Sequence, residues 1–151
     1  MSVCTFLASD YPLPEVSPER EYPLFINVDE GTVDDGGADD NFFLRDFPDV
    51  GSYTDKTYGV ALEWRYTQGR AKRILAYIGD ALQNTDVVEL WHVWLMDYCE
   101  FEDRPFIHRK AVPLGELTAE CIRELEDAEI WNTPDRMYPN RPSFYCISIY
   151  K

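Results

Sequence analysis

The sequence predicts a single α+β domain over residues 1–151, in which one mixed, mainly antiparallel sheet carries two helices packed on one face. Three observations predict this fold class. The chain has 151 residues, close to the length of one domain. Several short segments alternate apolar and polar residues, as strands do, and two longer segments repeat apolar residues at helical spacing. The two kinds of segment are interspersed along the chain, which favours an α+β arrangement.

The N-terminal part of the chain is predicted to consist mainly of strands. Residues 2–8 alternate and form a first strand, and the prolines within residues 10–21 make an extended connection. Residues 22–28 alternate again, and residues 41–45 favour a short strand. Over residues 57–66 the alternation is regular and one face is large and apolar, which predicts a strand packed on the core.

A helix and the centre of the sheet are predicted next. Apolar residues at helical spacing predict a one-sided amphipathic helix over residues 68–84, with Thr67 as its N-cap. Residues 87–96 are apolar on both faces, which is typical of a central strand. Residues 106–112 are expected to form its hairpin partner across the loop 97–105.

The last two predicted elements are a second helix and a strand. Thr118 is expected to cap the second helix, whose inner stripe contains Cys121, Ile122, Leu125 and Ala128. Residues 143–150 alternate and form the last strand.

The charge balance limits the classes of partner. The chain has 28 Asp and Glu against 14 Lys and Arg, a net charge of −14. Such a surface repels phosphates, so nucleic acid is not an expected partner. A basic protein surface or a multivalent cation is favoured instead, and solubility alone is the alternative explanation.

Location and redox state are also predicted. No apolar run reaches the roughly 18 residues of a membrane span, and the first residues do not resemble a secretory signal, so we expect a cytoplasmic protein that does not bind membranes. The cysteines show no paired spacing and are expected to be free thiols: Cys4, Cys99, Cys121 and Cys146.

An acidic loop is the first candidate site. Residues 29–41 contain six acidic residues and no basic one. Three interpretations remain open: a partner-facing acidic patch, a solvated flexible loop, or a cation site through residues 29–40, although the spacing matches no calcium motif. The partner-binding residues predicted here are Asp34, Asp35, Asp39 and Asp40, together with Tyr98 from the loop 97–105.

The two histidines form the second candidate site. If residues 87–96 and 106–112 make a hairpin, His92 and His108 face each other across neighbouring strands. With Arg109 beside them, they could bind a small ligand or act as acid and base. The alternative is a hydrogen-bonded core His92 and an exposed His108, since a slip of one residue would separate the pair.

Basic residues cluster around the start of the first helix: Arg65, Arg70, Lys72 and Arg73. Cations at a helix N-terminus oppose the helix dipole, so either nearby carboxylates compensate them or a small anion binds there. No phosphate-binding loop, nucleophile motif or metal-ligand spacing occurs, so the sequence predicts no catalytic residue, no metal site and no cofactor.

Three segments resemble those of a family of small, acidic, uncharacterised bacterial proteins: residues 2–13 (SVCTFLASDYPL), 39–44 (DDNFFL) and 102–110 (EDRPFIHRK). The resemblance spans nearly the whole chain. It implies a bacterial, cytosolic, single-domain protein and carries no activity, cofactor or catalytic residue.

Two functions of different classes follow. The first is a non-enzymatic binding module for a basic partner, such as an acidic inhibitor or immunity-type protein, steered by the acidic loop and anchored by exposed aromatic residues. The second is an enzyme or small-ligand-binding domain that uses His92 and His108 beside the sheet.

Overall fold

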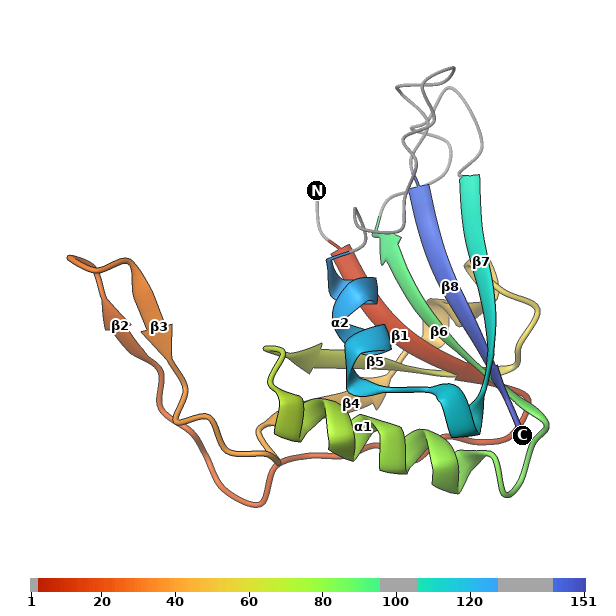
Figure 1. Ribbon diagram of the computed structural model, residues 1–151, viewed down its shortest axis with the longest axis horizontal. Helices are drawn as coiled ribbons and strands as arrows, with labels where there is room; N and C mark the ends of the chain where they lie inside the picture. The colour runs from red at the N-terminus through yellow and green to blue at the C-terminus, as the bar shows by residue number, and fades with distance from the viewer. Residues whose placement is uncertain (1–2, 96–105, 128–142) are drawn as a thin grey trace.

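The computed structural model describes residues 3–95, 106–127 and 143–151 of the chain (Figure 1). It has one mixed six-stranded sheet in the order β4-β5-β1-β6-β8-β7 and a separate two-stranded sheet, β2-β3. The strands are β1 (Val3–Ser9), β2 (Phe25–Asn27), β3 (Thr32–Asp34), β4 (Phe42–Asp46), β5 (Tyr58–Trp64), β6 (Val87–Trp94), β7 (Phe106–Pro113) and β8 (Ser143–Tyr150). The α-helices are α1 (Gln68–Ala81) and α2 (Ala119–Glu126), and the 3₁₀ segments are η1 (Pro48–Ser52) and η3 (Leu114–Glu116).

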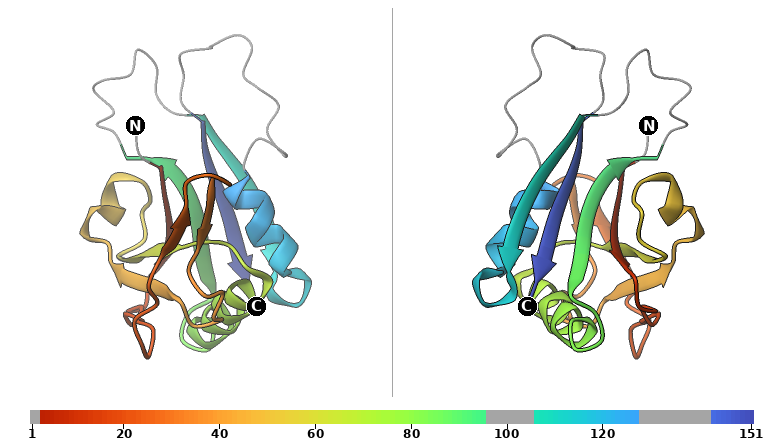
Figure 2. Two further views of the ribbon diagram at one scale, coloured as in Figure 1. Left: turned by 90° about the vertical axis from the view of Figure 1, so that its left-hand side faces the viewer. Right: turned by 90° about the vertical axis from the view of Figure 1, so that its right-hand side faces the viewer.

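The predicted fold class is confirmed. All neighbouring strands of the large sheet are antiparallel except β7 and β8, which are parallel. Both α-helices pack on one face of this sheet, where Ile74 and Ile78 of α1 and Ile122 and Leu125 of α2 are fully buried in one core cluster (Figure 2). None of the helices in the described ranges is long and apolar enough to cross a bilayer.

Both predicted N-caps are confirmed. The Thr67 side chain accepts a hydrogen bond from the backbone N–H of Arg70, at 3.1 Å, and Thr118 accepts one from Cys121, at 3.4 Å. Each cap satisfies a backbone donor that the first turn of a helix leaves without an intrahelical partner.

The second face of the sheet is covered by the 3₁₀ segment η1 and its flanking residues, and no α-helix of the described residues packs there. Phe6 stacks on Trp91 with ring centroids 5.9 Å apart, and Phe47 lies 4.7 Å from Phe6. Val50 and Tyr53 pack in the same hydrophobic cluster. The sheet is therefore buried on both faces, which explains why residues 87–94 are apolar on both sides.

A close backbone approach on this second face requires glycine. A Cβ atom at Gly59 would lie 2.8 Å from both Cβ and Cγ2 of Val50. We therefore expect Gly59→Ala to lower the free energy of unfolding by about 1–3 kcal/mol, because η1 must shift. Gly51→Ala is the control, since a Cβ there meets no atom within 4 Å. Urea unfolding of both variants tests this, and equal stabilities would contradict the packing argument.

The predicted hairpin of residues 87–96 and 106–112 is wrong. β8 lies between β6 and β7, pairing antiparallel with β6 and parallel with β7. β7 reaches its parallel neighbour through a crossover that contains η3 and α2 on the helical face (Figure 1). The predicted loop 97–105 lies outside the described residues.

The predicted strand over residues 22–28 shortens to three residues and does not join the large sheet. β2 pairs only with β3, and the two form a hairpin that projects from the body of the molecule (Figure 1). Half of the segment expected to be a loop, residues 29–41, therefore belongs to this hairpin and its turn.

Candidate functional site

The β2-β3 hairpin carries apolar side chains that the domain does not cover. Leu24, Phe25, Ile26, Val28 and Val33 are 40–85% exposed. The hairpin lies at one end of the molecule, away from both helices (Figures 1 and 2). Exposed apolar residues that occur singly are ordinary, but here five lie in or beside one hairpin, with Ile26 directly opposite Val33, so this surface is a candidate interaction site.

The hairpin is held in shape by local contacts. Asn27 Oδ1 accepts hydrogen bonds from the backbone N–H groups of Asp29 and Glu30, at 3.1 and 3.2 Å. Gly31 has a φ of 64°, a left-handed conformation that glycine adopts without strain. Arg65 Nη1, from the end of β5, donates to the carbonyl oxygen of Val33 at 2.6 Å. These contacts join the turn of the hairpin to β2 and link β3 to the residue that follows β5.

The acidic loop divides into two groups. Asp29, Glu30 and Asp34 are exposed on the hairpin, and none of them forms an ion pair with a described residue. Asp35, Asp39 and Asp40 instead contact the rest of the domain. Of the four aspartates predicted to bind a partner, only Asp34 is held by no contact outside the loop.

Asp35 pairs with Arg70, whose side chain is fully buried at the start of α1. Arg70 Nη1 and Nη2 lie 2.9 Å from the two carboxylate oxygens of Asp35. The guanidinium also donates to the backbone oxygens of Ala38 and Arg65, each at 3.0 Å. The hydrogen bond from Arg70 holds the pKa of the Asp35 carboxyl below its usual range. An internal carboxylate, in place of a bound anion, compensates this cation.

Asp39 and Asp40 also serve the fold. The Asp39 carboxylate lies against Gly69 in the first turn of α1, because a Cβ atom at Gly69 would come within 1.9 Å of Asp39 Oδ1. A negative charge at the N-terminus of a helix interacts favourably with the helix dipole. Asp40 accepts a hydrogen bond from the Tyr22 hydroxyl and one from the backbone N–H of Glu19, at 3.2 Å. The Tyr22 hydrogen bond lowers the pKa of Asp40.

Tyr98, the fifth residue predicted to bind a partner, lies outside the described residues. The predicted cation site of residues 29–40 can be examined. Within the described residues, no group of three or more His, Cys, Asp or Glu side chains could hold a metal ion, so the loop 29–40 presents no such cluster.

His92 and His108 lie on the same, helical, face of the sheet but not on neighbouring strands. Each is the register partner of Tyr145, which stands between them on β8. With neighbouring strands about 4.8 Å apart, the two backbones are separated by roughly 10 Å. The His108 ring stacks on Tyr145 at 5.0 Å. Arg109 points to the opposite face, with its guanidinium 5.2 Å from the Trp91 ring, so the three residues do not share one site.

His92 joins a polar cluster that sequence reasoning missed. The Thr5 hydroxyl donates to Glu126 Oε1 at 2.8 Å and lies 2.9 Å from His92 Nδ1. Because the single hydroxyl proton goes to Glu126, Nδ1 carries the imidazole proton and donates to Thr5. Trp64 Nε1 donates to the same carboxylate oxygen at 3.3 Å. No local pattern indicates this cluster, because its members come from β1, β5, β6 and α2.

The half-buried position of His92 predicts a pH effect on stability. Desolvation lowers its pKa below the usual 6.5, and Glu126 opposes this only in part. The unfolded chain therefore takes up the proton first, and stability falls as the pH drops below about 6.5. We expect His92→Gln to have a shallower loss of stability than the wild type between about pH 6.5 and 5. Urea unfolding along this pH range measures it, and an unchanged slope would contradict the assignment.

Glu89 forms a second buried polar cluster, on the face opposite the α-helices. Its carboxylate accepts hydrogen bonds from Thr54 Oγ1 and, at 3.2 Å, from Trp91 Nε1. Arg109 Nη1 lies 3.7 Å from its other oxygen. These donors already compensate the carboxylate, so the cluster explains how a buried acid is tolerated and does not by itself indicate a ligand.

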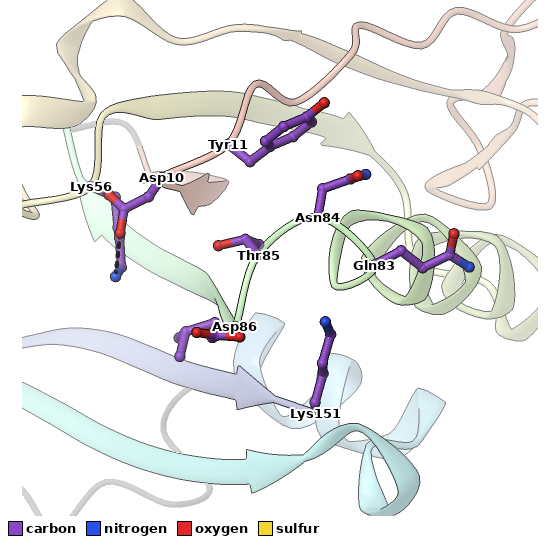
Figure 3. Close-up of a pocket in the computed structure, with 9 residues that line it drawn as sticks. Asp10, Tyr11, Lys56, Gln83, Asn84, Thr85, Asp86 and Lys151 are labelled. Carbon is purple, nitrogen blue, oxygen red and sulfur yellow. Dashed lines mark hydrogen bonds and ion pairs between the residues drawn. The ribbon is translucent and has the colours of Figure 1, made fainter.

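A polar pocket of about 600 Å³ lies beside the turn between α1 and β6 (Figure 3). Lys56 and Asp10 form an ion pair of 3.1 Å on one side of it, and Lys151 lies on the other. Gln83, Asn84 and Asp86 in its lining are exposed to solvent. Its charged groups are thus already paired or hydrated, and we assign it no function.

No relative helps to interpret the hairpin, the two polar clusters or the pocket of Figure 3. Comparison of the chain with protein-family models, with curated proteins and with solved structures finds no match.

Proposed function

We propose that this chain is a non-enzymatic binding module whose β2-β3 hairpin docks on a basic protein. An acidic inhibitor or immunity-type protein of the bacterial cytoplasm is the concrete form of this proposal. The observation that supports it is the group of large apolar side chains exposed on the hairpin: Leu24, Phe25, Ile26, Val28 and Val33.

The physical chemistry of the hairpin favours a partner that covers it. A two-stranded hairpin in water is marginally stable by itself, and burying exposed apolar side chains is favourable. The Arg65 contact and the Asn27 turn orient the hairpin in advance, which reduces the entropy that binding must overcome.

Charge indicates which partner this is. Asp29, Glu30 and Asp34 lie next to the apolar side chains and form no ion pair among the described residues. A partner with Lys or Arg around an apolar pocket would complement both features. With 28 acidic residues against 14 basic ones, the chain would also steer such a partner toward itself over a distance.

A photo-cross-linking residue at Val28 tests this proposal. Val28 is the most exposed apolar residue of the hairpin, at 85%. In cells that produce the full chain, we expect light to join it to a basic protein, identified by mass spectrometry. The matched control carries the same photo-cross-linking residue at Asp80, an exposed position near the C-terminal end of α1. Cross-links only to a second copy of the chain, only to acidic proteins, or equally from both positions would overturn the proposal.

A further inference from the structure

A cleft opens where the large sheet divides between β1 and β5. The two strands pair only as far as Thr5, opposite Leu62. Beyond this pair β1 follows β6 to Val3, whereas β5 follows β4 to Trp64. The separating strands line a cavity of about 510 Å³, a size that suits a small molecule.

Glu126, at the C-terminal end of α2, supplies a charge to this cleft. The side chain is half-buried, and its hydrogen bonds come from the neutral donors Thr5 and Trp64, both to Oε1. Within the described residues, no Lys or Arg forms an ion pair with it. A carboxylate has about four acceptor positions, so it can still accept hydrogen bonds from a cation.

The other groups in the cleft do not neutralise this charge. Burial lowers the pKa of His92, so the imidazole is neutral at pH 7. Burial, Glu63 and Glu126 raise the pKa of the Cys4 thiol to about 11, so it stays protonated. Glu63 also lines the cleft, but it alternates with Trp64 along β5, faces the other side of the sheet and is paired with Arg45 at 3.1 Å. Among the described residues that line the cleft, Glu126 is therefore the carboxylate without a basic partner.

Apolar side chains form the remaining walls. Val3, Leu62, Trp64 and Leu95 line the cleft beside the polar groups. The indole of Trp64 takes part in both environments, because its N–H donates to Glu126 while its ring offers an apolar and cation-attracting surface. An apolar wall beside a carboxylate with remaining acceptor capacity matches a ligand with an apolar body and one positive charge.

We propose that the cleft between β1 and β5 binds a small primary amine, with its ammonium group on Glu126 and its apolar body against Trp64. An anion of the same shape would be repelled by Glu126, and a neutral alcohol would lack the charge that the carboxylate attracts. This site is separate from the hairpin, so the proposed amine binding does not depend on the proposed protein partner.

Titration with phenethylamine, followed by NMR of the full chain, tests the site. The indole N–H signal of Trp64, assigned with a Trp64→Phe variant, reports on the hydrogen bond to Glu126. We expect phenethylamine to shift this signal saturably, 3-phenylpropionate to leave it unchanged and 2-phenylethanol to bind at least about tenfold more weakly than the amine. Equal responses to the amine, the anion and the alcohol would overturn the proposal.

A variant pair locates the charge. Glu126→Gln is expected to weaken phenethylamine binding by about tenfold or more. Glu120→Gln, on the same helix but with a side chain 63% exposed, is expected to bind like the wild type. If Glu126→Gln keeps the wild-type affinity, the assignment is wrong. If that variant does not fold, the comparison of the three ligands on the wild-type chain decides the question.

Discussion

Asp35→Asn is expected to lower the free energy of unfolding by about 3 kcal/mol. The Arg70 side chain is fully buried, and Asp35 contributes both of the carboxylate oxygens that pair with it at 2.9 Å. Asparagine keeps the shape but removes the charge, which leaves a buried cation without its counter-ion. Urea unfolding measures the loss, which is large compared with the total stability of a domain.

The neighbouring Asp34 provides a matched control. Its side chain is exposed, and among the described residues it accepts a hydrogen bond only from the backbone N–H of Gly36, at 2.8 Å, so Asp34→Asn should change stability by less than about 0.5 kcal/mol. Adding Arg70→Met to Asp35→Asn is expected to restore part of the loss, because no buried charge then remains. Equal stabilities of the Asp34 and Asp35 variants would contradict a structural role for this pair.

The same pair predicts part of the acid sensitivity. Arg70 holds the pKa of Asp35 below its value in the unfolded chain, so the unfolded chain binds the proton first as the pH falls. The stabilisation is therefore complete above about pH 4 and is lost as the pH falls through the lowered pKa. In the Asp35→Asn variant this part of the pH dependence should be absent.

Ile26→Asp is expected to weaken binding of the cross-linked partner by about 30-fold or more. Ile26 is 67% exposed in the middle of β2, opposite Val33, and we place it at the centre of the proposed interface. Binding would bury the new carboxylate in an apolar contact, where it loses its hydration and gains no compensating hydrogen bond or ion pair. Isothermal titration calorimetry with the purified partner measures the change.

The stability of the free protein separates this effect from unfolding. Because Ile26 packs on no buried core cluster, Ile26→Asp should leave the melting temperature nearly unchanged. Asp86→Asn, an exposed change beside the pocket of Figure 3, should alter neither the affinity nor the melting temperature. An Ile26 variant that binds like the wild type would exclude the hairpin from the interface.

Local signals predicted local structure well. Thr67 and Thr118 were predicted as N-caps because a cap depends on residues within one turn of it, and both caps are present. The strand over residues 57–66 was likewise predicted from its own alternation, and β5 occupies Tyr58–Trp64.

Strand partners were less predictable, for a physical reason. Only residues 97–105 separate the segments 87–96 and 106–112 in the sequence, but β8, from the end of the chain, lies between β6 and β7. Alternation indicates which residues share a face and contains no information about which strand lies alongside. His92 and His108 were therefore placed on one face correctly and on adjacent strands wrongly.

Tertiary contacts of single polar residues left no signal in the sequence. Thr5 and Glu126 are 121 positions apart, yet they share a hydrogen bond. Similarly, the apolar alternation of residues 22–28 is the same for a strand packed on a core and for one that projects into solvent. The acidic composition of residues 29–41 did not reveal that Asp35 pairs internally whereas Asp34 faces solvent.

The salt dependence of partner binding tests the central claim most directly. Affinity for the cross-linked protein would be measured at about 0.05 M and about 0.5 M salt, for the wild type and for a variant with Asp29→Asn, Glu30→Gln and Asp34→Asn. If the hairpin recognises a basic surface, the wild type binds far more tightly at low salt and the variant loses most of that difference. Equal salt dependence in the two proteins would contradict the claim.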